Sequence, residues 1–240
     1  MSQLTQVTDT NTTDSRWHWL YKVAGMSALV TAVLIVVHMI VFIIWPPPNT
    51  AIEYFKLFQD NALLGFLSLD LLYVIDNVLL IPILLALYSA LRRTNESFML
   101  LGTALGFVGI AALFASNPAA NMYFLSERYA AAATDAQRAL SLAAGEAMLA
   151  VFAGTPYHLS LILGSVGLVI IPIVMLQSKI FSKATGVMGI LANVLALGFY
   201  VPKIGIYILL FSVIFLLVWY IQITRRLFQL GRNMPKEALH

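Results

Sequence analysis

The fold of this chain is decided by one long apolar stretch, residues 62–91, whose sequence is ALLGFLSLDLLYVIDNVLLIPILLALYSAL. A run of about 20 apolar residues can cross the hydrocarbon core of a membrane as one helix. Two acids, Asp70 and Asp76, interrupt the run. In a helix they share an arc of about 120° with Tyr73 and Asn77, so these four side chains form one polar stripe. The stripe is predicted to face protein or water.

The composition of the whole chain is that of a membrane protein. Of its 240 residues, 60% are hydrophobic and 10% are charged, against about 45–50% and about 25% in soluble domains. The net charge of +3 is small and its basic residues flank apolar runs, which argues against a nucleic-acid surface. The absence of cysteine excludes disulfides and thiolate sites.

The sequence predicts an all-α fold, a polytopic membrane helix bundle with six transmembrane helices plus interfacial or re-entrant helices on the outer side. Residues 1–15 are too polar to be buried and are expected to be a disordered cytoplasmic tail. Residues 16–232 are expected to form a single membrane domain, and residues 233–240 a second cytoplasmic tail. The predicted spans are about 23–45, 62–91, 98–116, 157–177, 184–201 and 206–223.

Two capping boxes mark helices between the spans. Thr50 and Glu53 open a short amphipathic helix after three prolines, and we expect it to lie flat in the membrane interface. Thr134 and Gln137 open an alanine-rich helix at 135–152, which is short for a span and contains charged residues. It is expected to pack on the outer side or to re-enter the membrane partway.

The third span carries Gly102 and Gly106, a pair that favours close contact with another helix.

The distribution of basic residues supports an even number of spans with both termini in the cytoplasm. Six spans place ten basic residues inside and four outside, in agreement with the positive-inside rule. A seventh span at 135–152 would move the basic C-terminal segment outside. The inner residues are Arg16, Lys22, Arg92, Arg93, Lys179, Lys183, Arg225, Arg226, Arg232 and Lys236, and the outer ones are Lys56, Arg128, Arg138 and Lys203.

Several short motifs resemble those of a widespread bacterial family of six-span integral membrane proteins with no assigned activity. The motifs are SERYAAA at 126–132, AQRAL at 136–140, GE at 145–146, YH at 157–158, GILAN at 189–193 and RLFQLGR at 226–232. The resemblance covers about residues 20–232 and implies a bacterial cytoplasmic membrane. It implies no catalytic or binding residues.

Polar residues converge at similar depth in the outer half of the predicted bundle, and these are the candidate ligand-binding residues. An acid at the centre of a span costs roughly 2.5–3.5 kcal/mol, so such a residue is a candidate functional group by default. Asp76 is expected to face the bundle interior and meet His38 or His158, and Glu146 could instead form a structural pair with Arg128 or Arg138. The candidates are His38, Asp70, Tyr73, Asp76, Asn77, Asn121, Glu146 and His158.

Three functions fit this pattern. The first is a non-enzymatic protein, or a carrier, whose outward-opening polar cavity binds a small molecule or lipid. The second is an intramembrane hydrolase in which His38, His158 and a carboxylate hold zinc, although no His-x-x-x-His pair is present. The third is a structural or accessory subunit. We expect no cofactor and no nucleic-acid partner, and membrane lipids with a small-molecule ligand as partners.

Overall fold

A computed structural model describes residues 17–232 of the chain, and its elements are helices joined by short connections. Both predicted tails, with Arg16 and Lys236, lie outside these residues. The helices are α1 (His18–Ile44), α2 (Ala51–Asp60), α3 (Ala62–Ser68), α4 (Leu71–Leu91), α5 (Glu96–Ser116), α6 (Ala119–Ala131), α7 (Asp135–Phe152), α8 (Thr155–Gln177), α9 (Lys183–Leu197) and α10 (Gly205–Arg232), with a short 3₁₀ turn, η2 (Gly198–Tyr200), between the last two.

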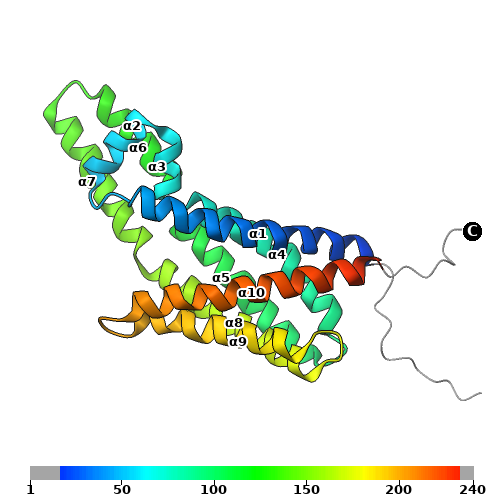
Figure 1. The fold of residues 1–240 in the computed structure, drawn as a ribbon. Coiled ribbons are helices and arrows are strands. Elements are labelled where there is room, and N and C mark those ends of the chain that lie inside the picture. The colour runs from blue at the N-terminus through cyan, green and yellow to red at the C-terminus, as the bar shows by residue number, and fades with distance from the viewer. Residues whose placement is uncertain (1–16, 233–240) are drawn as a thin grey trace, which may run out of the picture.

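Six segments of the described chain are long and apolar enough to cross a membrane, which confirms the predicted multi-pass helical bundle. They contain α1, α4, α5, α8, α9 and α10. Helices α1 and α10 run side by side along the length of the bundle (Figure 1). The last helix continues to Arg232, beyond the predicted end at 223, so the basic C-terminal segment belongs to the same helix.

The most extensive helix contact of the described chain joins α5 to α8, and glycines line it. Gly102 lies against the carbonyl of Gly167, and Gly109 lies against the backbone of Gly164. Because glycine has no Cβ, the two backbones approach closely and their van der Waals contact replaces the hydrophobic effect, which is weak between helices in lipid. The predicted small-residue contact face is therefore confirmed.

Four helices, α2, α3, α6 and α7, gather beyond one end of the bundle, and we call them the cap (Figure 1). A separate apolar core holds them together, in which Phe55 of α2 stacks on Tyr129 of α6 with ring centroids 5.5 Å apart. Gly145 of α7 allows Phe55 and Ala51 to approach its backbone. The ambiguous segment 135–152 is thus a cap helix that packs on α2 and α6.

Helix α2, predicted to lie flat in the membrane interface, packs its apolar face against the other cap helices. Its capping box and amphipathic pattern are present, but its apolar face is covered by protein. Tyr54, Phe55 and Phe58 are each at most 3% exposed within the cap core. The sequence pattern shows that one face must be buried, and it does not distinguish lipid from a partner helix that lies far along the chain.

The prediction that residues 62–91 form a single helix is wrong, because the helix breaks at Asp70. Asp70 has φ 61° and ψ 31°, the left-handed conformation, which ends α3 and begins α4. The region before the break belongs to the cap, and only α4 belongs to the bundle. Pro82 lies inside α4, which is continuous on both sides of it.

Basic residues concentrate at the end of the bundle opposite the cap. The connections α4–α5 and α8–α9 and the end of α10 carry them, and Arg226 donates from Nε to the carbonyl of Ile180 across two of these segments. At the cap end, the described basic residues are Lys56, Arg128, Arg138 and Lys203, whereas the opposite end has Lys22, Arg92, Arg93, Lys179, Lys183, Arg225, Arg226 and Arg232.

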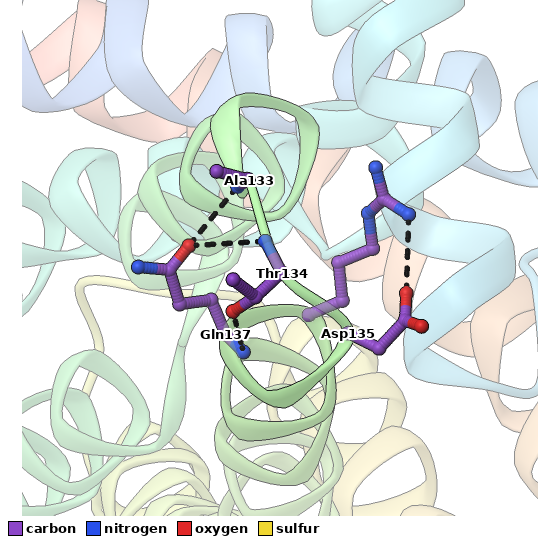
Figure 2. Close-up of polar contacts among 5 residues, drawn as sticks. Ala133, Thr134, Asp135 and Gln137 are labelled. Carbon is purple, nitrogen blue, oxygen red and sulfur yellow. Dashed lines mark hydrogen bonds and ion pairs between the residues drawn. The ribbon is translucent and has the colours of Figure 1, made fainter.

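The two capping boxes of the cap differ in one residue, which is the ionisable Glu53 at the start of α2 and the neutral Gln137 at the start of α7. This difference makes a pH test possible. Glu53 accepts from the N–H groups of Asn49 and Thr50 at 3.0 and 3.3 Å. Gln137 makes the equivalent bonds to Ala133 and Thr134 at 3.0 and 3.4 Å (Figure 2). The hydrogen bond from Asn49 holds the pKa of Glu53 below its ordinary value of 4.5, and Thr50 adds to this effect.

We therefore expect acid to loosen the start of α2 but not the start of α7. The stabilisation from Glu53 is present above pH 4.5 and is lost as the pH falls through the lower pKa of the folded state. Amide-exchange protection at Asn49 and Thr50 should fall over that range, while protection at Ala133 and Thr134 stays constant. Glu53→Gln should remove the pH dependence, and a variant that retained it would assign the effect to another group.

Candidate functional site

The break between α3 and α4 at Asp70 is stabilised by side chains from α2 and from the end of α5. Asn117, at the end of α5, donates from Nδ2 to the carbonyl of Leu69 at 2.6 Å. Tyr54 of α2 donates to the carbonyl of Ser68 at 3.3 Å. Two carbonyls that a continuous helix would pair internally are therefore satisfied by the cap and by α5, which removes the main penalty for interrupting the helix there.

Burial raises the pKa of Tyr54 to about 12, and the nearby charge of Asp70 acts in the same direction. Its hydroxyl is therefore protonated at neutral pH and able to donate this hydrogen bond.

The left-handed turn places the carboxylate of Asp70 against His38 of α1. The distance from Nε2 to Oδ1 is 3.5 Å, and the side chains are 22% and 15% exposed. The imidazole also contacts Phe42, with ring centroids 4.7 Å apart. His38 thus meets Asp70, the acid at the break, rather than making the predicted hydrogen bond with Asp76.

Asp76 lies in α4, almost two turns after the break, and is only 7% exposed. Its Oδ1 atom is buried and has no hydrogen-bond partner among the described residues. His38 of α1 lies within electrostatic range of this carboxylate, as do Tyr73 of α4 and Tyr220 of α10. The carboxylate therefore lies where three helices meet and faces protein rather than lipid.

Tyr157 and Asn77 border the same region. Tyr157, in the first turn of α8, interacts electrostatically with Asp70 and Tyr73. Asn77 is buried beside Asp76 and donates to the carbonyl of Tyr73 within its own helix at 2.9 Å. We call the set His38, Asp70, Tyr73, Asp76, Asn77, Tyr157 and Tyr220 the polar junction.

The remaining candidates lie outside the polar junction. His158 faces Tyr200, with 3.1 Å between Nδ1 and the hydroxyl. Asn121 is exposed in the cap and donates to the sulfur of Met148 at 3.7 Å. The candidate list from the sequence is therefore divided into residues that share one site and residues that do not.

Glu146 has a structural contact that differs from the predicted ones. Its Oε1 accepts from the N–H of Ala51 at 2.9 Å and ties α7 to the start of α2. Arg138, a predicted partner, pairs instead with Asp135 at 3.4 Å (Figure 2). Glu146 therefore replaces solvent at a helix N-terminus, where a carboxylate is favoured by the unpaired N–H groups and the helix dipole.

The zinc arrangement considered from the sequence is not assembled in residues 17–232. No group of three or more His, Asp or Glu side chains in this part of the chain is placed to hold a metal ion. His38 and His158 belong to different contacts, one with Asp70 and the other with Tyr200.

Two residues of the polar junction region had no usable signal in the sequence. Tyr220 lies in the middle of an apolar helix with no other acid or histidine nearby, and only the packing of α10 brings it to Asp76. Tyr54 follows the apolar pattern of its amphipathic helix, yet its hydroxyl donates to the carbonyl of Ser68 at the break. The double role of tyrosine, with an apolar ring and a polar tip, explains both omissions.

Comparison of the chain with family models, with curated proteins and with solved structures yields no match. The polar junction itself is therefore the basis for an assignment of function.

Proposed function

We propose that this chain is a membrane protein that binds a small molecule or a lipid headgroup at the polar junction, as a receptor or carrier. The observation that carries this proposal is Asp76. A buried carboxylate without a hydrogen bond is costly, since desolvation removes water from a group that has gained no partner. Such a group in a membrane helix marks a binding or transport site more often than a structural one.

The position of the polar junction supports a binding role. It lies where the cap meets the bundle, between segments that connect through the non-regular turn at Asp70. Irregular backbone at membrane depth is tolerated where it is covered by protein or borders a cavity. Polar side chains on otherwise apolar helices are also the usual composition of a small-molecule site.

The proposed location is a bacterial cytoplasmic membrane, with the cap outside and both termini in the cytoplasm. The excess of basic residues at the end opposite the cap supports this orientation, and the family resemblance supports the membrane type. The polar junction would then receive its ligand from the outer side.

Ligand-dependent melting of the purified protein tests the binding proposal. A ligand at one hundred times its Kd stabilises a folded protein by about 2.7 kcal/mol. We expect at least one member of a panel of small polar molecules and lipids to raise the Tm of the wild-type protein but not that of Asp76→Asn. Asp135→Asn is the matched control, because Asp135 is a fully exposed cap residue.

The same experiment identifies a purely structural role. If Asp76→Asn melts at the same or a higher temperature and no compound shifts the Tm of either protein, the carboxylate does not serve a ligand and the proposal is wrong. An equal shift in both proteins would place the binding site away from Asp76.

A further inference from the structure

The charges of the polar junction are unbalanced. It contains two carboxylates, Asp70 and Asp76, and one group able to carry positive charge, His38, which is 3.5 Å from Asp70. His38 is also the charged group that acts on Asp76, so both acids depend on the same imidazole. An anionic ligand would meet two carboxylates with one shared imidazole to offset them, whereas a cationic ligand would supply the partner that Asp76 lacks.

The oxygen atoms of the site distinguish an organic cation from a metal ion. A metal such as Ca²⁺ takes about six to eight oxygen ligands, and Mg²⁺ needs an octahedral set. The carbonyls nearest the break, those of Ser68 and Leu69, already accept hydrogen bonds from Tyr54 and Asn117. An ammonium group needs only one to three acceptors, and the free Oδ1 of Asp76 provides the first of them.

Aromatic rings around Asp76 favour the same class of ligand. Tyr73 of the same helix and Tyr220 of α10 lie within electrostatic range of Asp76, and Tyr157 of α8 lies within electrostatic range of Tyr73. Tyrosine faces attract cations, most strongly where water is excluded. Their hydroxyls can also accept from an N–H donor.

We propose that the polar junction binds a protonated primary amine, with the ammonium group on Asp76 and an apolar remainder between the helices. This inference rests on the proposed binding function and specifies its ligand class. The amine could come from a free alkylamine or from the headgroup of an aminophospholipid, and both present the same ammonium group to the carboxylate.

Three compounds of matched shape but different charge test the ligand class without any mutation. The full chain is placed in nanodiscs of phosphatidylcholine, and its Tm is measured with hexylamine, hexanol and hexanoate at pH 7. We expect hexylamine to raise the Tm and the other two to leave it unchanged or lower it. Stabilisation by hexanol or hexanoate instead of hexylamine would overturn the amine assignment. If Asp76→Asn then lost the stabilisation by hexanol or hexanoate, the proposed binding function would still stand.

The Asp76→Asn variant provides a second test of the ligand class. Asp76→Asn should bind hexylamine about ten- to hundredfold more weakly, as expected for the loss of one hydrogen bond to a charged group. Asp135→Asn should bind it as the wild type does. If Asp76→Asn does not fold, Asp76→Glu keeps the charge and should retain the hexylamine shift. Equal binding by wild type and Asp76→Asn, or loss of the shift in a folded Asp76→Glu, would overturn the assignment.

Nanodiscs of different lipid composition distinguish the two sources of amine. If a lipid headgroup is the ligand, phosphatidylethanolamine should raise the Tm of the wild type above that in phosphatidylcholine, and it should weaken the effect of added hexylamine. If a free amine is the ligand, hexylamine should act equally in both lipids. Stabilisation by NaCl at the same concentration, with no response to hexylamine, would assign the site to a metal cation and overturn the proposal.

Discussion

Gly167→Ala is expected to destabilise the bundle by about 1–3 kcal/mol, the range for overpacking. A Cβ atom at position 167 would lie 2.6 Å from the carbonyl oxygen of Gly102 and 2.9 Å from the backbone nitrogen of Gly106. Both obstacles are backbone atoms of α5, so no side chain can rotate away. The two helices would have to separate along the most extensive helix contact of the described chain.

Gly164→Ala in the same helix is the matched control. A Cβ at position 164 has no atom within 4 Å, so this change should be neutral or stabilising by up to about 1 kcal/mol, the difference in helix propensity. Thermal unfolding in detergent with the two variants side by side gives the comparison. Equal destabilisation by both variants would show that backbone approach at Gly167 does not limit the packing of α5 and α8.

Asp70→Ala is expected to lower stability by more than Asp70→Asn, because Asp70 has two roles. Its backbone is left-handed, with φ 61°, which costs about 1–2 kcal/mol for alanine and is better tolerated by asparagine. Its carboxylate lies 3.5 Å from His38. Asparagine keeps the backbone preference and removes the charge, so the difference between the two variants measures the cost of the turn.

Asp70→Gly completes this test by allowing the left-handed turn while removing the side chain. We expect it to melt above Asp70→Ala, in spite of having fewer atoms, since glycine adopts positive φ without steric penalty. Unfolding temperatures of the three variants in one detergent are sufficient. If alanine proved as stable as glycine, the turn would not constrain this position, and the ion pair with His38 would be its main contribution.

The sequence predicts the features of this fold that depend on neighbours along the chain. Span positions follow from apolar runs, both capping boxes follow from spacing of three, and the contact face of α5 follows from its glycines. Each of these signals is contained within one helix. The same is true of the polar stripe, although Asp70 contributes to it from a turn rather than from the helix.

Features that depend on distant partners could not be predicted in this way. The break at Asp70 has no Gly, Pro or Asn to indicate it, and it is stabilised by Asn117, which follows 47 residues later. Glu146 caps a helix 95 residues earlier in the chain. These pairings are set by how the helices pack, so a pattern within a single segment does not contain them.

The helices of the cap are made at different times during synthesis, so its core cannot form until the last of them is complete. Its core joins α2 and α3, made early, to α6 and α7, which are completed about 90 residues after the end of α2. At about 5–20 residues per second, the ribosome needs on the order of 5–20 s to make the later half. During that time the aromatic face of α2, with Phe55 and Phe58, lacks the surface that finally buries it. We infer that the newly made α2 and α3 require lipid or a chaperone as a temporary partner.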